Sequence, residues 1–384
     1  MTCGKDGALV TSAPGIRRTS RRLADGREII YFDDSPGAPP READDTRPLG
    51  KRARAGQLRH DALVGDWVAV AGHRLNRTFL PPKDECPLCP TGAGSVPSEV
   101  PETTYDVVVF ENRFPSFAPV TADLPEGLAT SALFGLRPAA GRCEVVCFTS
   151  DHDSTFADLT PARARTVIEA WVDRTQLLGA LPRVEQVFCF ENRGQEIGVT
   201  LHHPHGQIYA YPYLPQRSAD LLKAATEHHK RTGRLLGADI LAAERADGQR
   251  VVISGTHWTA YVPFAARWPV EVHLAPHRDV PDLPALTGEE REELAEVYLE
   301  LLRRLDRYYL RKDSSPIHLP YIAGWHQAPA KQGRDVSRLH LQVMSVLRSP
   351  GKLKYLAGSE SGVGGWVNDV PPERIAARLR EVAG

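Results

Sequence analysis

The sequence contains no apolar stretch long enough to cross a membrane. A transmembrane helix needs about 20 consecutive apolar residues, and no uninterrupted run in the 384 residues approaches that length. The first 26 residues include four arginines but no apolar core of a signal peptide: Arg17, Arg18, Arg21 and Arg22. We therefore expect a cytoplasmic protein without a membrane-spanning segment.

An excess of charge of one sign is also missing, and cysteine is sparse. The 47 basic and 48 acidic residues leave a formal net charge of −1, so nothing in the overall charge favours nucleic acid or an anionic membrane as a partner. Six cysteines in a chain of this length are expected to be free thiols or metal ligands, because a large core does not need disulfides.

What is present is the composition of an ordinary globular protein, with 42% hydrophobic and 25% charged residues. The length allows two core-bearing units or one domain of doubled architecture. Short apolar runs predict strands at residues 28–32, 67–70, 107–110, 187–190 and 339–347. Caps and periodicity predict helices that begin after Thr160 and Thr287, a long helical region over 218–246 and a closing helix over 371–382.

One stretch of the chain echoes another, which indicates an internal duplication. Residues 145–178 read as a strand, a turn with a histidine and an amphipathic helix, and residues 270–305 repeat that order. Further on, His340-Leu341-Gln342 echoes His205-Gly206-Gln207. We predict two related halves, 56–215 and 216–384, preceded by an accessory extension, 1–55, that is largely an exposed loop.

The most informative stretch is His203-Pro204-His205-Gly206-Gln207. If it is extended, His203, His205 and Gln207 share one face, since side chains alternate along a strand. Pro204 supplies no ladder donor, which favours an edge or a break in a sheet where a ligand can approach. Two satisfied histidines in a loop are the structural alternative. A neutral imidazole can attack phosphorus near pH 7 without a separate base.

A second motif is the knuckle Cys86-Pro87-Leu88-Cys89. Alone it could be redox-active or half of a zinc site. No second Cys-x-x-Cys pair is present in the sequence, so an all-cysteine finger would need the distant cysteines, whereas two histidines would complete a tetrahedral site.

The motif at 203–207 resembles the signature of the galactose-1-phosphate uridylyltransferase family, the transferase branch of the histidine-triad superfamily. The resemblance implies an α+β fold of two histidine-triad-like halves, each an antiparallel sheet with packed helices. It implies a transferase of galactose metabolism that exchanges UMP between UDP-glucose and galactose 1-phosphate by a ping-pong route. His205 would carry the uridylyl group, Gln207 would donate to a phosphoryl oxygen, and the His203 carbonyl would orient His205.

The same resemblance assigns further residues. It implies a structural zinc ion on Cys86, Cys89, His152 and His203. It implies contacts to UDP-glucose or UDP-galactose from Arg74, Arg77, Asn112, Phe114, Asn192, Gly198 and Thr200, together with Gln207. Arg113 stands where the family commonly has an acidic residue, and Val199 replaces a common cysteine.

Two family features lie in the C-terminal half. A hexose-binding loop with Lys354, Gly358 and Glu360 would reach the active site of a neighbouring subunit, which implies a homodimer. Of a second metal site, His326 and His340 match, whereas Leu221 and Gln342 stand at the other two positions, so we predict that this site is degenerate or empty.

Two other functions would explain part of the pattern. A related nucleotidylyltransferase or phosphorylase that acts on ADP-glucose or dinucleoside polyphosphates would share His205 and zinc, but would differ around Asn112, Phe114 and Glu360. A zinc-binding interaction module without catalysis would explain the four metal ligands, but would leave His205 and Gln207 without a role.

Overall fold

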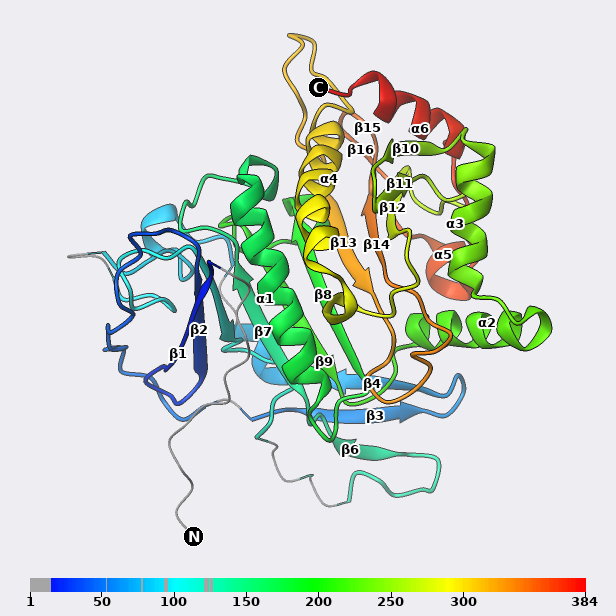
Figure 1. Cartoon of the computed structure of the whole chain (residues 1–384). Helices are drawn as coiled ribbons and strands as arrows, with labels where there is room; N and C mark the ends of the chain where they lie inside the picture. Colours follow the sequence, from blue (N-terminus) through cyan, green and yellow to red (C-terminus); the bar gives the residue numbers. More distant parts are fainter. Residues whose placement is uncertain (1–14, 53, 77–78, 93–95, 121–123, 125–126) are drawn as a thin grey trace.

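The molecule is built on one broad sheet, with two long helices, α1 (Pro161–Gly179) and α4 (Gly288–Asp306), packed side by side against it (Figure 1). The structure is a computed structural model and describes residues 15–52, 54–76, 79–92, 96–120, 124 and 127–384. Within these residues, no helix is both long and apolar enough to cross a membrane.

Eleven of the described strands form a single antiparallel sheet. In order across the sheet they are β1 (Arg17–Arg22), β2 (Glu28–Asp33), β5 (Val107–Glu111), β7 (Arg142–Cys147), β9 (His205–Tyr211), β8 (Gln186–Arg193), β13 (Tyr321–His326), β14 (His340–Ser345), β12 (Val270–Pro276), β11 (Trp258–Tyr261) and β10 (Val251–Ser254). The predicted α+β fold of two related halves is confirmed: β7, α1, β8 and β9 of the first half recur in the same order as β12, α4, β13 and β14.

The halves meet at a seam between β8 and β13, where Phe190 pairs with Gly324 and Arg193 with Tyr321. The expectation of a separate sheet in each half therefore needs correction, because the seam makes one sheet of both. Gly324 explains the close approach: a Cβ at this position would lie 2.5 Å from the Phe188 ring.

The two faces of the sheet have different chemistry. The face beneath α1 and α4 is apolar, with Trp171 of α1 stacked on Phe156 at a ring distance of 5.9 Å. On β9, Ile208 and Ala210 belong to this core, so the alternate residues His205, Gln207 and Tyr209 face the other way. The polar side chains of the motif are therefore placed on the face without α1 and α4.

Smaller elements cover that second face. Over the first half lies a three-stranded sheet, β4-β3-β6, and over the second half lie α2 and α3. The bounds are β3 Gln57–Asp61, β4 Asp66–Val70, β6 Leu136–Pro138, α2 Gln216–Thr232 and α3 Leu236–Asp247. The chain closes with β15 (Leu347–Ser349), β16 (Lys352–Leu353), α5 (Gly358–Val363) and α6 (Pro372–Glu381).

The helix starts follow the predicted caps. The Thr160 hydroxyl accepts a hydrogen bond from the Arg163 amide at 3.1 Å, and Thr287 and Glu290 form a reciprocal capping box. The single helical region predicted over 218–246 is wrong in one respect: it is broken into α2 and α3. Gly233 adopts φ +70° and its amide bonds the His229 carbonyl at 2.8 Å, which ends α2.

The N-terminal segment is less separate than expected. The strand predicted at 28–32 is present as β2, but it pairs with β5, and its side chains Ile29 to Phe32 are buried on both faces. The loop that follows is also tied down, since Arg41 is buried and pairs with Asp33. Residues from 17 onward thus complete the main sheet, because an apolar run of this kind needs cover on both sides.

Candidate functional site

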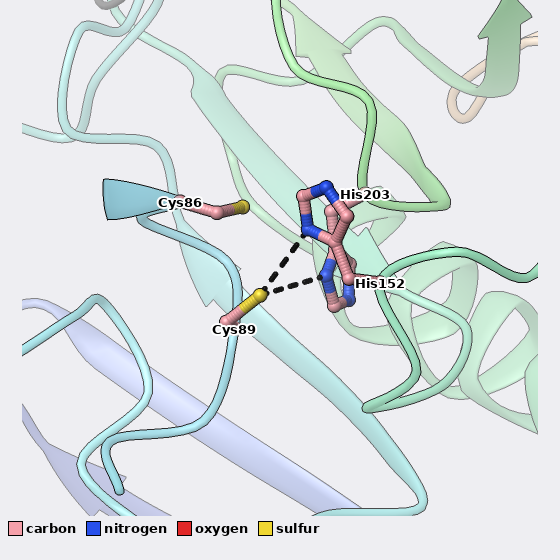
Figure 2. A group of neighbouring side chains, drawn as sticks. All are labelled: Cys86, Cys89, His152 and His203. Carbon is pink, nitrogen blue, oxygen red and sulfur yellow. Dashed lines mark hydrogen bonds between the residues drawn. The ribbon is translucent and has the colours of Figure 1, made fainter. Parts of the chain in front are cut away.

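Four side chains converge beside the start of β9 to form a cluster of two sulfurs and two imidazoles (Figure 2). One ligand atom from each of Cys86, Cys89, His152 and His203 lies within 4.8 Å of all the others. The Cys89 sulfur is 3.3 Å from Nδ1 of His152 and 3.5 Å from Nδ1 of His203. These are the four residues to which the sequence assigned a metal ion, and the cluster could hold one.

The partners of His203 suit it to metal binding. Its Nε2 is 2.8 Å from the Thr149 carbonyl oxygen, which can only accept, so Nε2 carries the proton and Nδ1 keeps its lone pair for the cluster. The buried hydroxyl of Tyr105 lies 2.7 Å from the same Nε2 and donates to the Leu88 carbonyl. Tyr105 thereby ties the histidine to the cysteine knuckle, a role that the sequence analysis did not find.

The electrostatics of the cluster also favour a bound cation. Burial, followed by the neighbouring Cys86 sulfur, raises the pKa of Cys89 to about 12, and burial lowers the pKa of His203 to about 4. Two thiolates become stable at this depth only when a positive charge lies among them. Two sulfurs and two imidazole nitrogens form the donor set of a closed tetrahedral zinc site.

His205 is the first residue of β9 and lies two residues after His203. Its Nδ1 donates to the His203 carbonyl at 2.7 Å, which leaves the lone pair on Nε2. Burial lowers the pKa of His205, so the ring is neutral near pH 7. The expectation that His203 and His205 share one face of a strand is wrong, because the strand begins only at His205 and His203 turns back into the metal-binding cluster.

A cavity of about 200 Å³ opens beside His205, and Asn192 of β8 lines it. Gln207 is the next residue on the same face of β9. Its side-chain amide makes no hydrogen bond with the described residues. Gly206, which lies between them in the chain, allows a close approach of its neighbours. A Cβ at this position would be 2.9 Å from the Phe148 ring and from the Phe190 carbonyl. His205 therefore presents a neutral imidazole to this cavity, and Gln207 follows it along the same face of β9 without lining the cavity.

The residues assigned to the nucleotide lie in two groups. Arg74 donates to the Phe114 carbonyl at 2.9 Å, and the Asn112 side chain accepts from the Phe114 amide at 2.8 Å. The Arg74 guanidinium is also 3.5 Å from the hydroxyl of Tyr209, which shares the face of β9 with His205. Arg77 lies outside the residues that the structure describes.

The second group lies on the loop between β8 and β9. Gly198 adopts φ +83°, and the Thr200 carbonyl accepts from the Leu80 amide at 2.8 Å. Arg113 extends over the Phe114 ring and lies 3.9 Å from Glu99. The structure therefore brings the first group together around Phe114. Gly198 and Thr200 lie on the loop whose Val199 and Leu201 line the His205 cavity.

The residues of the predicted hexose-binding loop lie elsewhere in the chain. Lys354 is buried and forms an ion pair with Glu360 at 3.3 Å, and Gly358 begins α5. These residues do not line the cavity beside His205. Within one chain, the loop and the nucleophile are not neighbours.

A buried carboxyl group in the wall of this cavity, that of Glu191, is another feature that the sequence analysis missed. Glu191 is 5% exposed, and its Oε2 has no hydrogen-bond partner among the described residues. Burial raises the pKa of Glu191 to about 7, although Arg193 acts against it. Arg193 is engaged by Asp306 through both guanidinium nitrogens.

Two residues of the predicted second metal site, His326 and Gln342, form a hydrogen-bonded chain with Glu271. His326 bonds the Gln342 side-chain oxygen at 3.0 Å, and the Gln342 amide nitrogen donates to Glu271 at 2.7 Å. His340 stacks on His326 with a ring distance of 4.9 Å, while Leu221 lines the neighbouring cavity. Glu271 was not foreseen, although it alternates with the core residues of β12 and so faces Gln342.

Comparison with known proteins gives consistent matches. The family model of the galactose-1-phosphate uridyl transferase N-terminal domain matches residues 48–215, and that of the C-terminal domain matches residues 220–383. A galactose-1-phosphate uridylyltransferase of Streptomyces lividans is 47% identical over 376 residues, which cover 96% of this chain and 98% of the relative. One from Thermotoga maritima is 35% identical over 85% of this chain and 98% of the relative. A solved uridylyltransferase structure covers 85% of this chain and 98% of its own, with 32% identity and a TM-score of 0.73.

Proposed function

The chain belongs to the galactose-1-phosphate uridyl transferase family, and from that premise we propose that it moves a uridylyl group between UDP-glucose and galactose 1-phosphate through His205. The observation that carries this proposal is the geometry of His205, a neutral ring with Nδ1 fixed by the His203 carbonyl and Nε2 left as the nucleophile.

The reaction runs in two half-reactions. Nε2 of His205 attacks the α-phosphorus of UDP-glucose, the bond from that phosphorus to the bridging oxygen breaks, and glucose 1-phosphate leaves. The phosphate oxygen of galactose 1-phosphate then attacks the same phosphorus, the P–N bond breaks, and UDP-galactose leaves. Because Nδ1 donates to the His203 carbonyl, this hydrogen bond stabilises the positive charge that the ring gains as the P–N bond forms.

Gln207 supports the transition state. Its side chain shares a face of β9 with His205, and the amide is not engaged by the described residues. An amide N–H that is already in position stabilises the charge that builds on a non-bridging phosphoryl oxygen. We assign Asn192, which lines the His205 cavity, and the nearby loop residues Gly198 and Thr200 to the phosphates. Arg74, Asn112 and Phe114 form the wall that we assign to the uridine.

We assign a structural zinc ion to Cys86, Cys89, His152 and His203. When bound, it would close a tetrahedron of four protein ligands, hold thiolates at depth and leave no position for a reacting water. His203 contributes to catalysis through its main chain, because its carbonyl oxygen accepts a hydrogen bond from the His205 ring. The ion would thus fix the backbone that orients the nucleophile.

We also propose a homodimer. Large apolar side chains are exposed on and beside the small sheet: Val68 on β4, Leu63 at 95% in the turn before β4, and Phe134 at 56% just before β6. Exposed apolar side chains that gather in one region favour a protein partner. A neighbouring subunit could also bring Lys354 and Glu360 to a cavity that they do not reach within one chain. We expect light scattering to show a dimer and V68E to weaken it; a monomeric parent protein would remove this proposal.

A cytoplasmic location remains a prediction from the sequence.

The uridylyl-histidine can be tested directly. Incubation with UDP-glucose alone should add one uridylyl group to the protein, which intact-mass analysis and peptide mapping would place on His205. H205N should form no adduct and lose exchange activity, whereas H229N, at a partly buried position of α2 away from the cavity, should behave as the parent. A folded H205N protein that exchanges sugars at the parent rate would refute the assignment.

The same assay separates the alternatives. An ADP-glucose phosphorylase would form its adduct from ADP-glucose and release it to inorganic phosphate, so both nucleotide sugars should be compared. A zinc-binding module without catalysis would form no covalent adduct with either. The names of the curated relatives favour the uridylyl reaction.

A further inference from the structure

A second cavity, of about 430 Å³, lies in the C-terminal half between the sheet and the helices α2 and α3. Volumes of roughly 300–1,000 Å³ are typical of sites for small ligands. The cavity is larger than that beside His205 and belongs to the other half of the sheet. The proposed transferase reaction does not use it.

The internal duplication makes this cavity the counterpart of the proposed nucleotide site. His340 begins β14 as His205 begins β9, and its Nδ1 is 3.5 Å from the carbonyl of the residue two positions earlier, Arg338. No partner of His340 Nε2 is found among the described residues. Phe264 lines the cavity three residues after β11, just as Phe114 follows β5.

The charges in the cavity favour an anion. Arg217, in the first turn of α2, makes no hydrogen bond or ion pair within the part of the chain that the structure describes. Arg267 lies near it, and together with burial this second guanidinium lowers the pKa of Arg217. Two cations thus lie side by side without a paired anion.

Two carboxylates act on Arg217, Glu271 and Asp220, and both already accept hydrogen bonds. Asp220 accepts from the Gln216 side chain at 3.0 Å. Glu271 accepts hydrogen bonds from the amides of Arg267 and Trp268, from the Gln342 side chain and from His273, at 2.6 to 3.2 Å. It lines the same cavity, but its oxygens are directed to these donors. The Arg217 guanidinium therefore remains free to meet a ligand.

A neighbouring cavity of about 300 Å³ shares Arg217, Ser218, Arg267 and His326 with the first. Arg217, Ser218 and Arg267 are possible hydrogen-bond donors, whereas His326 already donates to Gln342, so the junction of the two cavities is suited to a phosphate group. Beyond the junction, the walls are mainly apolar and include Ile240, Tyr261 and Phe264, which can hold an aromatic base.

We propose that this cavity is a second ligand site, one that binds a nucleoside monophosphate with its phosphate at Arg217 and Arg267 and its base toward Phe264. His340 lines this site, but its Nδ1 proton is directed to the Arg338 carbonyl, so the two arginines hold the phosphate; its counterpart His205 serves as a nucleophile. Binding at this site involves no covalent step.

The test is calorimetric titration of the full-length protein with UMP and, separately, with AMP. We expect one of these nucleotides to occupy a site that R217Q weakens about tenfold or more, since a charge-assisted bond to phosphate is lost. R231Q, an exposed arginine on the same helix, is the matched control and should bind as the parent does. I240W, which fills the cavity from its half-exposed rim, should block the same site.

The exchange reaction is measured in parallel and should be unchanged in R217Q, so loss of this site and loss of the His205 chemistry are distinguishable. The proposal is overturned if neither nucleotide shows a site that R217Q and I240W weaken. It is also overturned if inorganic phosphate binds there as tightly as the nucleotide, because the base would then contribute nothing.

Discussion

Replacing Glu191 by glutamine should change how the stability of the protein depends on pH. Glu191 is buried beside the His205 cavity, with one oxygen unpaired among the described residues. Its pKa is raised by burial from an ordinary 4.5 to about 7. In the unfolded chain the carboxyl group is in water and titrates near its ordinary value.

The sign follows from proton linkage. Between about pH 4.5 and 7 the folded carboxyl keeps a proton that the unfolded chain has released, so the free energy of unfolding falls as pH rises through that window. The pKa differs between 4.5 in the unfolded chain and about 7 in the folded protein. At about 1.4 kcal/mol for each pKa unit, this difference amounts to about 3 kcal/mol. Most of this, about 2–3 kcal/mol, lies between pH 5 and 8.

Glutamine imitates the protonated carboxyl group and does not titrate. We therefore expect the free energy of unfolding of E191Q to rise by about 2–3 kcal/mol relative to that of the parent on going from pH 5 to pH 8. Reversible urea unfolding of both proteins at each pH measures this double difference, from which common changes at the metal-binding cluster cancel. E296Q, at an exposed position of α4, is the control and should show no pH-dependent difference. An equal E191Q effect at both pH values would refute the reasoning.

Three further predictions concern the cluster, the core and a helix cap. C86S should lower the metal content from about one zinc per chain to almost none by elemental analysis, because a thiolate ligand is lost; a retained full equivalent would contradict the zinc site. W171A removes an indole that is 2% exposed and packed on Phe156, so denaturation should show a loss of about 3–5 kcal/mol, and a loss below about 1 kcal/mol would contradict the packing. T287A removes the cap of α4 and should cost about 1 kcal/mol, whereas an unchanged midpoint would show that water replaces it.

The sequence was sufficient to predict features that depend on short-range chemistry. Thr160 and Thr287 marked helix starts because a hydroxyl must satisfy free amides there, and the Cys86 knuckle indicated half of a metal site. The partners in that cluster, His152 and His203, came from the family resemblance, and the structure places them beside the cysteines.

Features that depend on long-range pairing could not be predicted. Nothing local indicates that β8 pairs with β13, or that β2 adds to β5. Glu271 and Tyr105 escaped notice because their roles come from partners far along the chain. The break at Gly233 was overlooked since a single glycine within a helical pattern is often tolerated.

The seam between β8 and β13 has a consequence for how the protein can be divided. As an intact sheet, the molecule ends at β1 and β10, and β1 carries Arg17, Arg18, Arg21 and Arg22, whose charges discourage other chains from adding a strand. Expressing either half alone would uncover β8 or β13, in which residues 187–190 and 321–325 are mainly apolar and uncharged. Fragments cut between residues 215 and 216 should therefore aggregate separately and recover a sheet only when produced together.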